Sequence, residues 1–253
     1  MDRSDTVIAY FAPREVLLSQ RLILKTGYDV LVLKYLPHDV AWRVLKEFLR
    51  KYGYDYTVIT VDDVLVYGDN VRLMEEAHDI LGDKVISALM TMGMGLAVNE
   101  VWFSVTDKVL TRRPLTYRDY GLWNIETVNR KLREGRFHKV FYTGFGFTLM
   151  PSKVVELLPC EGMVRVPQRW MGRLIRKVQQ IDVRHSIELH KHGIEHYVDL
   201  MNVVNHLGNL RALVPRHRVP YGVVLVEKGK VIYDLSGEFP IEDWIKEILV
   251  GRG

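Results

Sequence analysis

Strand-like and helix-like patterns alternate three times in the first 82 residues, and this alternation constrains the fold more than any other feature. Three apolar runs are rich in β-branched and aromatic residues, as buried strands are. They comprise residues 6–11, 29–35 and 56–61. A helical pattern follows each run, and a glycine ends each pattern. We therefore predict an α/β fold with a mostly parallel sheet and right-handed crossovers.

The chain is long enough to bury a full core, since it has 253 residues of which 48% are hydrophobic. We expect a main domain over residues 1–218 and an appendage over residues 219–253. Within the appendage, a predicted hairpin turns at Lys228-Gly229 and a final helix starts at Pro240.

Two further features bear on the compartment. Residues 1–5 are polar and charged, unlike a secretory signal, and the apolar run 85–98 is too short to span a bilayer. The single cysteine, Cys160, cannot form an internal disulfide and fits a reducing environment. Together they predict a cytoplasmic protein.

The loop after the first apolar run lacks glycine. No glycine lies between Phe11 and Thr26, so neither a dinucleotide-binding fingerprint nor a P-loop can form there. An oxidoreductase or a P-loop kinase is therefore disfavoured. The same absence argues against a sugar nucleotidyltransferase, which needs a glycine-rich loop to wrap a nucleoside triphosphate. The formal net charge of +4 still favours a phosphate-bearing partner, whether nucleotide, lipid head group or nucleic acid.

Two adjacent acids, Asp62 and Asp63, follow the third apolar run directly. Ligands of open α/β sheets bind at the carboxyl ends of the strands. Buried carboxylates need a cation or hydrogen bonds to compensate them. The pair is thus a candidate site for Mg²⁺ or Mn²⁺ carrying phosphate oxygens. The alternative is a turn in which both acids only cap backbone amides.

A basic segment covers residues 164–184. On a helix, four of its cationic residues would share one side. They are Arg169, Arg173, Arg176 and Lys177. This face is either solvated or in contact with phosphate, so an alternative function is binding to nucleic acid or an anionic surface through Arg165 to Arg184. Against nucleic acid stand the absence of a known binding signature and the near balance of 35 basic and 31 acidic residues.

Four histidines, His185, His190, His192 and His196, suggest a second alternative, a zinc hydrolase. Gly193 interrupts the helix that would bring the last two onto one face, and no glutamate lies in a recognised zinc motif. Surface histidines are the favoured interpretation.

Three pieces of the chain occur in the order of one family. They are the acid-tipped strand ending in Val61-Asp62-Asp63, the glycine-aromatic segment Gly144-Phe145-Gly146-Phe147, and a final stretch with Asp182, Gly193, Tyr197-Val198-Asp199 and Asn205-His206-Leu207-Gly208. On these pieces the chain resembles a nucleotide-sugar-dependent glycosyltransferase of the GT-A type over about residues 6–210. It departs from the commoner aspartate-any-aspartate pattern, because Val61 stands two positions before Asp63.

The resemblance implies a GT-A-like (Rossmann-like) mixed sheet flanked by helices, and roles for particular residues. Asp62 and Asp63 would hold Mn²⁺ or Mg²⁺ against the donor diphosphate, and His206 would add a metal ligand. Asp182 matches the catalytic base of inverting members. The remaining donor-binding positions would be Ala12, Pro13, Arg14, Glu15 and Gly144, together with Asp62.

The implied donor is a nucleoside-diphosphate sugar, and the acceptor is a hydroxyl on a glycan, protein or lipid. A cation stabilises the charge that develops on the leaving diphosphate, and a carboxylate takes the acceptor's proton. The appendage helix carries an apolar face with Ile241, Trp244 and Ile248, for which homodimer contact and peripheral membrane contact are both open.

Overall fold

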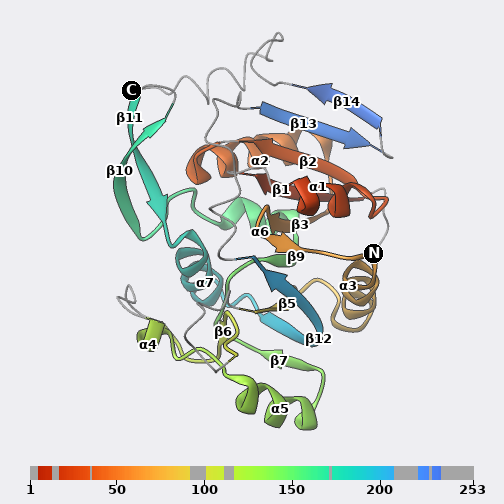
Figure 1. Ribbon diagram of the computed structural model, residues 1–253, viewed down its shortest axis with the longest axis vertical. Helices are drawn as coiled ribbons and strands as arrows, with labels where there is room; N and C mark the ends of the chain where they lie inside the picture. The colour runs from red at the N-terminus through yellow and green to blue at the C-terminus, as the bar shows by residue number, and fades with distance from the viewer. Residues whose placement is uncertain are drawn as a thin grey trace.

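A central sheet of ten strands organises the computed structural model, which describes residues 5–12, 17–34, 36–91, 101–110, 117–170, 173–207, 222–227 and 230–234 (Figure 1). Its strands are β1 (Thr6–Ala12), β2 (Asp29–Lys34), β3 (Tyr56–Val61), β4 (Val64–Leu65), β5 (Val85–Thr91), β7 (Phe137–Lys139), β9 (Phe147–Pro151), β12 (His196–His206), β13 (Gly222–Glu227) and β14 (Lys230–Asp234). Their order is β14-β13-β2-β1-β3-β9-β5-β12-β4, and β7 pairs with β12.

The remaining described elements surround this sheet. The helices are α1 (Leu17–Leu24), α2 (His38–Tyr52), α3 (Gly68–Leu81), α4 (Tyr117–Tyr120), α5 (Ile125–Glu134), α6 (Ser152–Leu157) and α7 (Ile181–Lys191). Two further strand pairs are separate from the main sheet. They are β6 (Val105–Thr106) with β8 (Tyr142–Thr143), and β10 (Val164–Trp170) with β11 (Arg173–Gln179).

The principal strands of the sheet run in one direction. β1 is parallel to β2 and β3, and β12 is parallel to β5. β9 lies between β3 and β5 and is antiparallel to both, so β5 has the direction of β3. The fold is therefore mixed α/β with a largely parallel central sheet, as the alternating pattern predicts.

The first three strand-helix units are confirmed, but the N-caps that the sequence predicts for the second and third helices, Asp39 and either Asp69 or Asn70, are wrong. Asp39 does not cap α2, because Pro37 precedes the helix and Asp39 lies within its first turn. Neither Asp69 nor Asn70 is the N-cap of α3, which is Tyr67. The Asn70 side chain acts from inside the first turn, where its Oδ1 accepts a hydrogen bond from the Tyr67 N–H at 2.9 Å.

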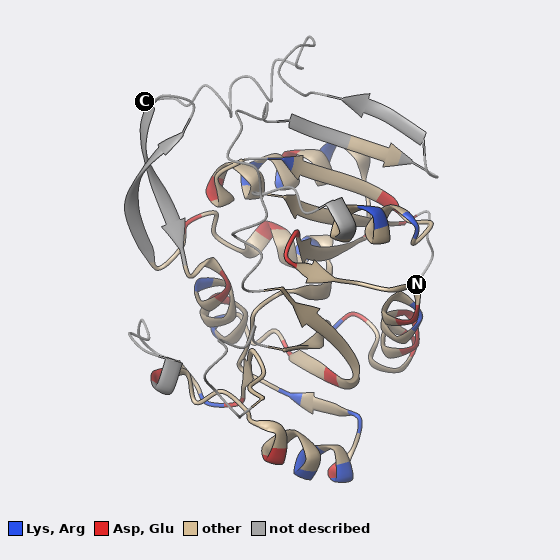
Figure 2. Cartoon of the chain, viewed as in Figure 1, with Lys and Arg blue, Asp and Glu red and all other residues tan. Residues whose placement is uncertain are grey.

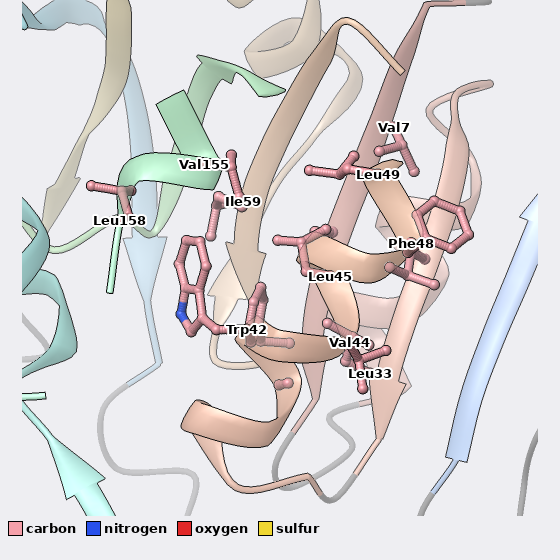
Figure 3. Packing of buried hydrophobic residues seen from close by; sticks show 14 of the residues in the cluster. Val7, Leu33, Trp42, Val44, Leu45, Phe48, Leu49, Ile59, Val155 and Leu158 are labelled. Atoms are coloured by element: carbon pink, nitrogen blue, oxygen red, sulfur yellow. The ribbon is translucent and has the colours of Figure 1, made fainter. Parts of the chain in front are cut away.

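One face of α2 packs on the sheet and contributes to one of the hydrophobic cores (Figure 3). Its buried residues are Ala41, Trp42, Val44, Leu45, Phe48 and Leu49. They contact the strand residues Val7, Leu33 and Ile59, and α6 closes the cluster with Val155 and Leu158. Full burial of such side chains stabilises the fold by about 1.5–3 kcal/mol each. Charged residues concentrate on the helices and loops, while the described parts of the central strands carry few (Figure 2).

The sequence predicts a helix over about residues 124–134 with Ile125, Val128 and Leu132 as its buried stripe, but in α5 this stripe is only partly buried. Val128 is buried, but Ile125 and Leu132 are each 42% exposed. Asn124 does cap the helix, since its side chain accepts a hydrogen bond from the Thr127 N–H at 3.0 Å. Residues 112–123, which the sequence predicts to form an ordered loop because they are rich in basic and aromatic residues, include the short helix α4.

The prediction of a basic helix within residues 164–184 is wrong up to Gln179. β10 and β11 form an antiparallel ribbon in which Trp170 pairs with Arg173 and Val166 pairs with Lys177. Alternation of valine with polar residues at the start of the segment favours a strand. The arginines therefore do not share one helix face.

The predicted C-terminal hairpin is confirmed and extends the main sheet. β13 is antiparallel to β14 and also to β2, with Leu225 opposite Leu31. The expected domain boundary at residues 218–219 and the expected helix from Pro240 lie outside the described residues. Among the helices that the structure describes, none is long and apolar enough to cross a membrane.

Candidate functional site

The carboxyl ends of the parallel strands lie along one edge of the sheet. β1 ends at Ala12, β3 at Val61, β5 at Thr91 and β12 at His206. Because these strands run in one direction, the residues that follow them converge on this edge, where open α/β sheets bind ligands.

The two adjacent acids form the turn that joins β3 to β4. The Asp62 N–H donates to the Phe11 carbonyl at 2.9 Å, which continues the ladder between β1 and β3 for one more residue. Both side chains are buried, with Asp62 0% and Asp63 6% exposed. The turn is therefore anchored to the neighbouring strand, and it brings two carboxylates to the carboxyl edge.

The end of β12 lies against this turn. β4 pairs with β12 in the antiparallel direction, with Val64 opposite His206. The Leu207 N–H donates to the Asp63 carbonyl at 2.6 Å. Nε2 of His206 lies 2.9 Å from Oδ2 of Asp63. The structure thus brings two of the predicted metal ligands into contact, although 143 positions separate them in the chain (206 minus 63).

The donor atoms of this pair fit a divalent cation. Two adjacent ligands, each about 2.1 Å from one octahedral ion, stand about 3.0 Å apart. The same separation suits a hydrogen bond, which a cation held by both side chains would replace. Within the described ranges, no group of three or more His, Cys, Asp or Glu side chains could hold a metal ion. Asp63 and His206 would therefore need ligand oxygens from a diphosphate or water.

The other predicted nucleotide contacts are placed only in part. Ala12 is the buried last residue of β1, opposite Lys34. Pro13, Arg14 and Glu15 lie outside the described residues, so their predicted contact with a nucleotide stays a prediction.

The glycine-aromatic turn lies beside the acid turn. A Cβ on Gly146 would collide with Sδ of Met90 and approach the Val64 side chain to 3.2 Å. A Cβ on Gly144 would also meet Met90, and would lie 2.6 Å from Oγ of Ser104. Both glycines thus permit close packing between β5 and β9. Between them Phe145 has a left-handed backbone with φ of 47°, which is unfavourable by about 1–2 kcal/mol for a residue with a side chain.

Asp182 lies in the first turn of α7, and both of its carboxylate oxygens are hydrogen-bonded. The Tyr142 hydroxyl donates to Oδ2 at 2.8 Å, and the Val183 N–H donates to Oδ1 at 2.9 Å. Burial raises the pKa of Asp182, and these two hydrogen bonds oppose the rise. A carboxylate with a raised pKa is a stronger base.

A short series of contacts connects Asp182 with the acid turn. From Tyr142, the hydroxyl lies 3.3 Å from Oγ of Ser104. The Ser104 carbonyl accepts a hydrogen bond from the Gly144 N–H at 3.1 Å, and the Ser104 N–H donates to the Met90 carbonyl at 2.9 Å. Met90 packs on both glycines. These contacts link Asp182 to the glycine-aromatic turn, and Gly146 of that turn lies beside the Val64 side chain of β4.

Two of the four histidines proposed for zinc are buried, which corrects their interpretation as surface residues. Nε2 of His185 lies 2.8 Å from the Pro159 carbonyl, and Nε2 of His196 lies 2.9 Å from Oγ of Ser87. The Phe145 ring lies 5.8 Å from the His185 ring and 5.7 Å from the His196 ring. Burial lowers the pKa of each histidine to about 3, so both are neutral at pH 7. They are components of the core.

A buried ion pair that no sequence pattern indicated supports β12. The Arg136 guanidinium donates to both oxygens of Asp199, at 2.8 and 2.7 Å, and to the Leu73 carbonyl at 3.1 Å. Asp199 is fully buried and begins an irregularity in β12. There β12 advances four residues, from 199 to 203, while β5 advances one, from 88 to 89. The position of His206 at the end of β12 depends on this irregularity.

Comparison with solved structures shows likenesses at low sequence identity. No family model and no curated protein matches the chain. A solved structure titled "Crystal Structure of A197 from STIV" has 12% sequence identity and a TM-score of 0.43, and the match covers 94% of this chain and 96% of that one. A CMP:2-keto-3-deoxy-manno-octonic acid synthetase complexed with CTP has 11% identity and a TM-score of 0.39, covering 79% and 90% respectively. At these values the likenesses carry no argument about function.

Proposed function

We propose that this protein is a glycosyltransferase that moves a sugar from a nucleoside-diphosphate donor to an acceptor hydroxyl with the help of a divalent cation. The observation that carries the proposal is the contact of His206 with Asp63 at the carboxyl edge, 2.9 Å between Nε2 and Oδ2. A buried carboxylate and an imidazole at this spacing form a ready pair of ligands, at the edge where α/β sheets bind nucleotides.

The roles of the residues follow from their places. Asp63 and His206 would hold Mn²⁺ or Mg²⁺, and the bound ion supplies positive charge to the leaving diphosphate. Asp182 would accept the proton of the acceptor hydroxyl, since its raised pKa makes it a stronger base than an exposed aspartate.

Asp63→Ala should abolish metal-dependent nucleotide binding. Calorimetric titration of the full chain with UDP or GDP should show binding that requires Mn²⁺ or Mg²⁺. The variant should bind more than about 100-fold more weakly, because it loses a metal ligand directly rather than a residue that only orients one. Asp69→Ala is the matched control, since Asp69 is an exposed acid of α3 six positions along the chain.

Two results would contradict this assignment. If none of the nucleotides bound with either metal, the donor class would be wrong. If Asp63→Ala bound nucleotide with unchanged metal dependence, the metal would lie elsewhere.

Asp182→Asn separates binding from chemistry. The amide is nearly isosteric but cannot accept the acceptor's proton, so we expect donor binding within about twofold of wild type and transfer reduced by at least about 100-fold. Radiolabelled sugar transfer measures the second quantity once a donor is known. Loss of donor binding would instead place Asp182 among the donor or metal contacts.

A further inference from the structure

The carboxylate of Asp182 is held by groups from two different elements. Val183, its neighbour in α7, supplies a backbone N–H to Oδ1, and Tyr142 from β8 supplies a hydroxyl to Oδ2. Only the second contact involves a side chain, so a substitution can remove it without altering the helix backbone.

Tyr142 is itself firmly placed. It is 5% exposed, and β8 pairs with β6 at Thr106. Its ring lies 5.3 Å from the Tyr120 ring, and its hydroxyl lies 3.3 Å from Oγ of Ser104. Burial first, and then the negative charge of Asp182, raises the pKa of Tyr142 well above its usual value. The hydroxyl therefore keeps its proton at neutral pH and remains a donor to the carboxylate.

We propose that Tyr142 is a positioning residue, which fixes the orientation of the Asp182 carboxylate and sets how readily it takes up a proton. This inference rests on the proposed function, in which Asp182 is the base, but the contact itself can be tested without any activity. Asp182 would use a lone pair that its two hydrogen bonds leave available, since a carboxylate has about four acceptor positions.

The step that Tyr142 would support is the transfer of the sugar to the acceptor hydroxyl, in which every proton and electron pair is accounted for. The acceptor O–H bond breaks and its proton moves to Asp182, while the acceptor oxygen bonds to the anomeric carbon. The bond from that carbon to the diphosphate oxygen breaks, and its electron pair leaves with the diphosphate. Tyr142 donates a hydrogen bond throughout and neither gains nor loses a proton.

Tyr142→Phe tests the inference directly. A hydrogen bond donated to a carboxylate favours its charged form, so its loss should raise the pKa of Asp182 by about one to two units. Carbon-13 NMR titration of the aspartate carboxyls measures this shift, with Asp182→Asn to assign the signal. The acidic limb of the pH profile of transfer should move upward by the same amount. Tyr120→Phe is the matched control, because it removes a neighbouring tyrosine hydroxyl that does not contact Asp182. The Tyr120 hydroxyl lies 3.3 Å from Nε2 of Gln180, and the hydrogen bond from Tyr142 to Asp182 remains.

A second variant tests the same hydrogen bond in case Tyr142→Phe does not fold. Tyr142→3-fluorotyrosine, introduced at this site alone, keeps the ring and has a more acidic hydroxyl. The stronger donor should lower the pKa of Asp182, opposite to the effect of Tyr142→Phe. An Asp182 titration that either folded variant leaves unchanged would overturn the inference.

Failure of the inference can be told apart from failure of the proposed function. If the pKa of Asp182 shifts as expected in the Tyr142 variants but no nucleotide sugar supports transfer, then Tyr142 positions Asp182 and the proposed enzyme function is wrong. If transfer occurs and depends on Asp182, but the pH profile of transfer is the same in both Tyr142 variants as in the wild type, then the proposed function is supported and Tyr142 has only a structural role.

Discussion

Lowering the pH from 7 to 5 should destabilise this protein by about 4 kcal/mol through two buried histidines. The pKa of His185 and that of His196 are each lowered from 6.5 to about 3. For His185 burial is the largest cause, and the positive charges of Lys46 and Arg184 add to it. For His196 burial is the cause. Because the unfolded chain takes up these protons and the folded chain does not, stability is fully present above pH 6.5 and falls as the pH approaches 3.

Urea unfolding at pH 5, 6 and 7 measures the effect. Replacing one buried histidine by His185→Gln or His196→Gln should remove about 2 kcal/mol of the difference between pH 7 and pH 5, whatever the variant's stability at pH 7. His192→Gln, at an exposed position, supplies the baseline for replacing a histidine. If both buried replacements left the pH slope unchanged, these imidazoles would be protonated in the folded protein.

Arg136→Ala should lower the free energy of unfolding by about 3–5 kcal/mol, because it leaves the fully buried carboxylate of Asp199 without its cation. Arg136→Lys should recover only part of this loss, since an ammonium group cannot reproduce the two parallel hydrogen bonds of the guanidinium. Denaturant unfolding at pH 7 measures both variants.

The control for this prediction is Arg130→Ala. Arg130 forms an exposed ion pair with Glu134 one turn along α5, and such pairs contribute about 0.3–0.5 kcal/mol. Adding Asp199→Asn to Arg136→Ala should restore part of the stability, because the remaining group is then uncharged. Equal effects of Arg136→Ala and Arg130→Ala would show that the buried pair contributes little.

Local sequence patterns were sufficient for most of the sheet. The strands β1, β2, β3 and β5 are continuous apolar runs, and each is next to a helix that is followed by a glycine. The apolar runs and the glycines together predict where these strands lie. The pattern was insufficient for the ribbon of β10 and β11. There the spacing of Arg169, Arg173 and Arg176 also fits a helix, and the competing strand signal lies in the alternation that begins at Val164.

The candidate site was predictable only as separate pieces. Asp63 and His206 each follow from the resemblance, but their contact requires the antiparallel pairing of β4 with β12. Arg136 lies 63 positions from Asp199, and no local pattern links residues at that distance. The burial of His185 and His196 was not predicted either, because histidine occurs on both buried and exposed faces of helices and strands.

The insertion of β9 between β3 and β5 has a consequence for biosynthesis. As a ribosome produces the chain, β1, β2 and β3 can assemble from the first 61 residues, but β5 has no partner among them. It meets its neighbours only after Pro151 and then His206 have left the exit tunnel, so the hydrogen-bonding groups of its edges stay unpaired during much of translation. The half of the sheet that carries His206 is thus the half most dependent on protection of the nascent chain.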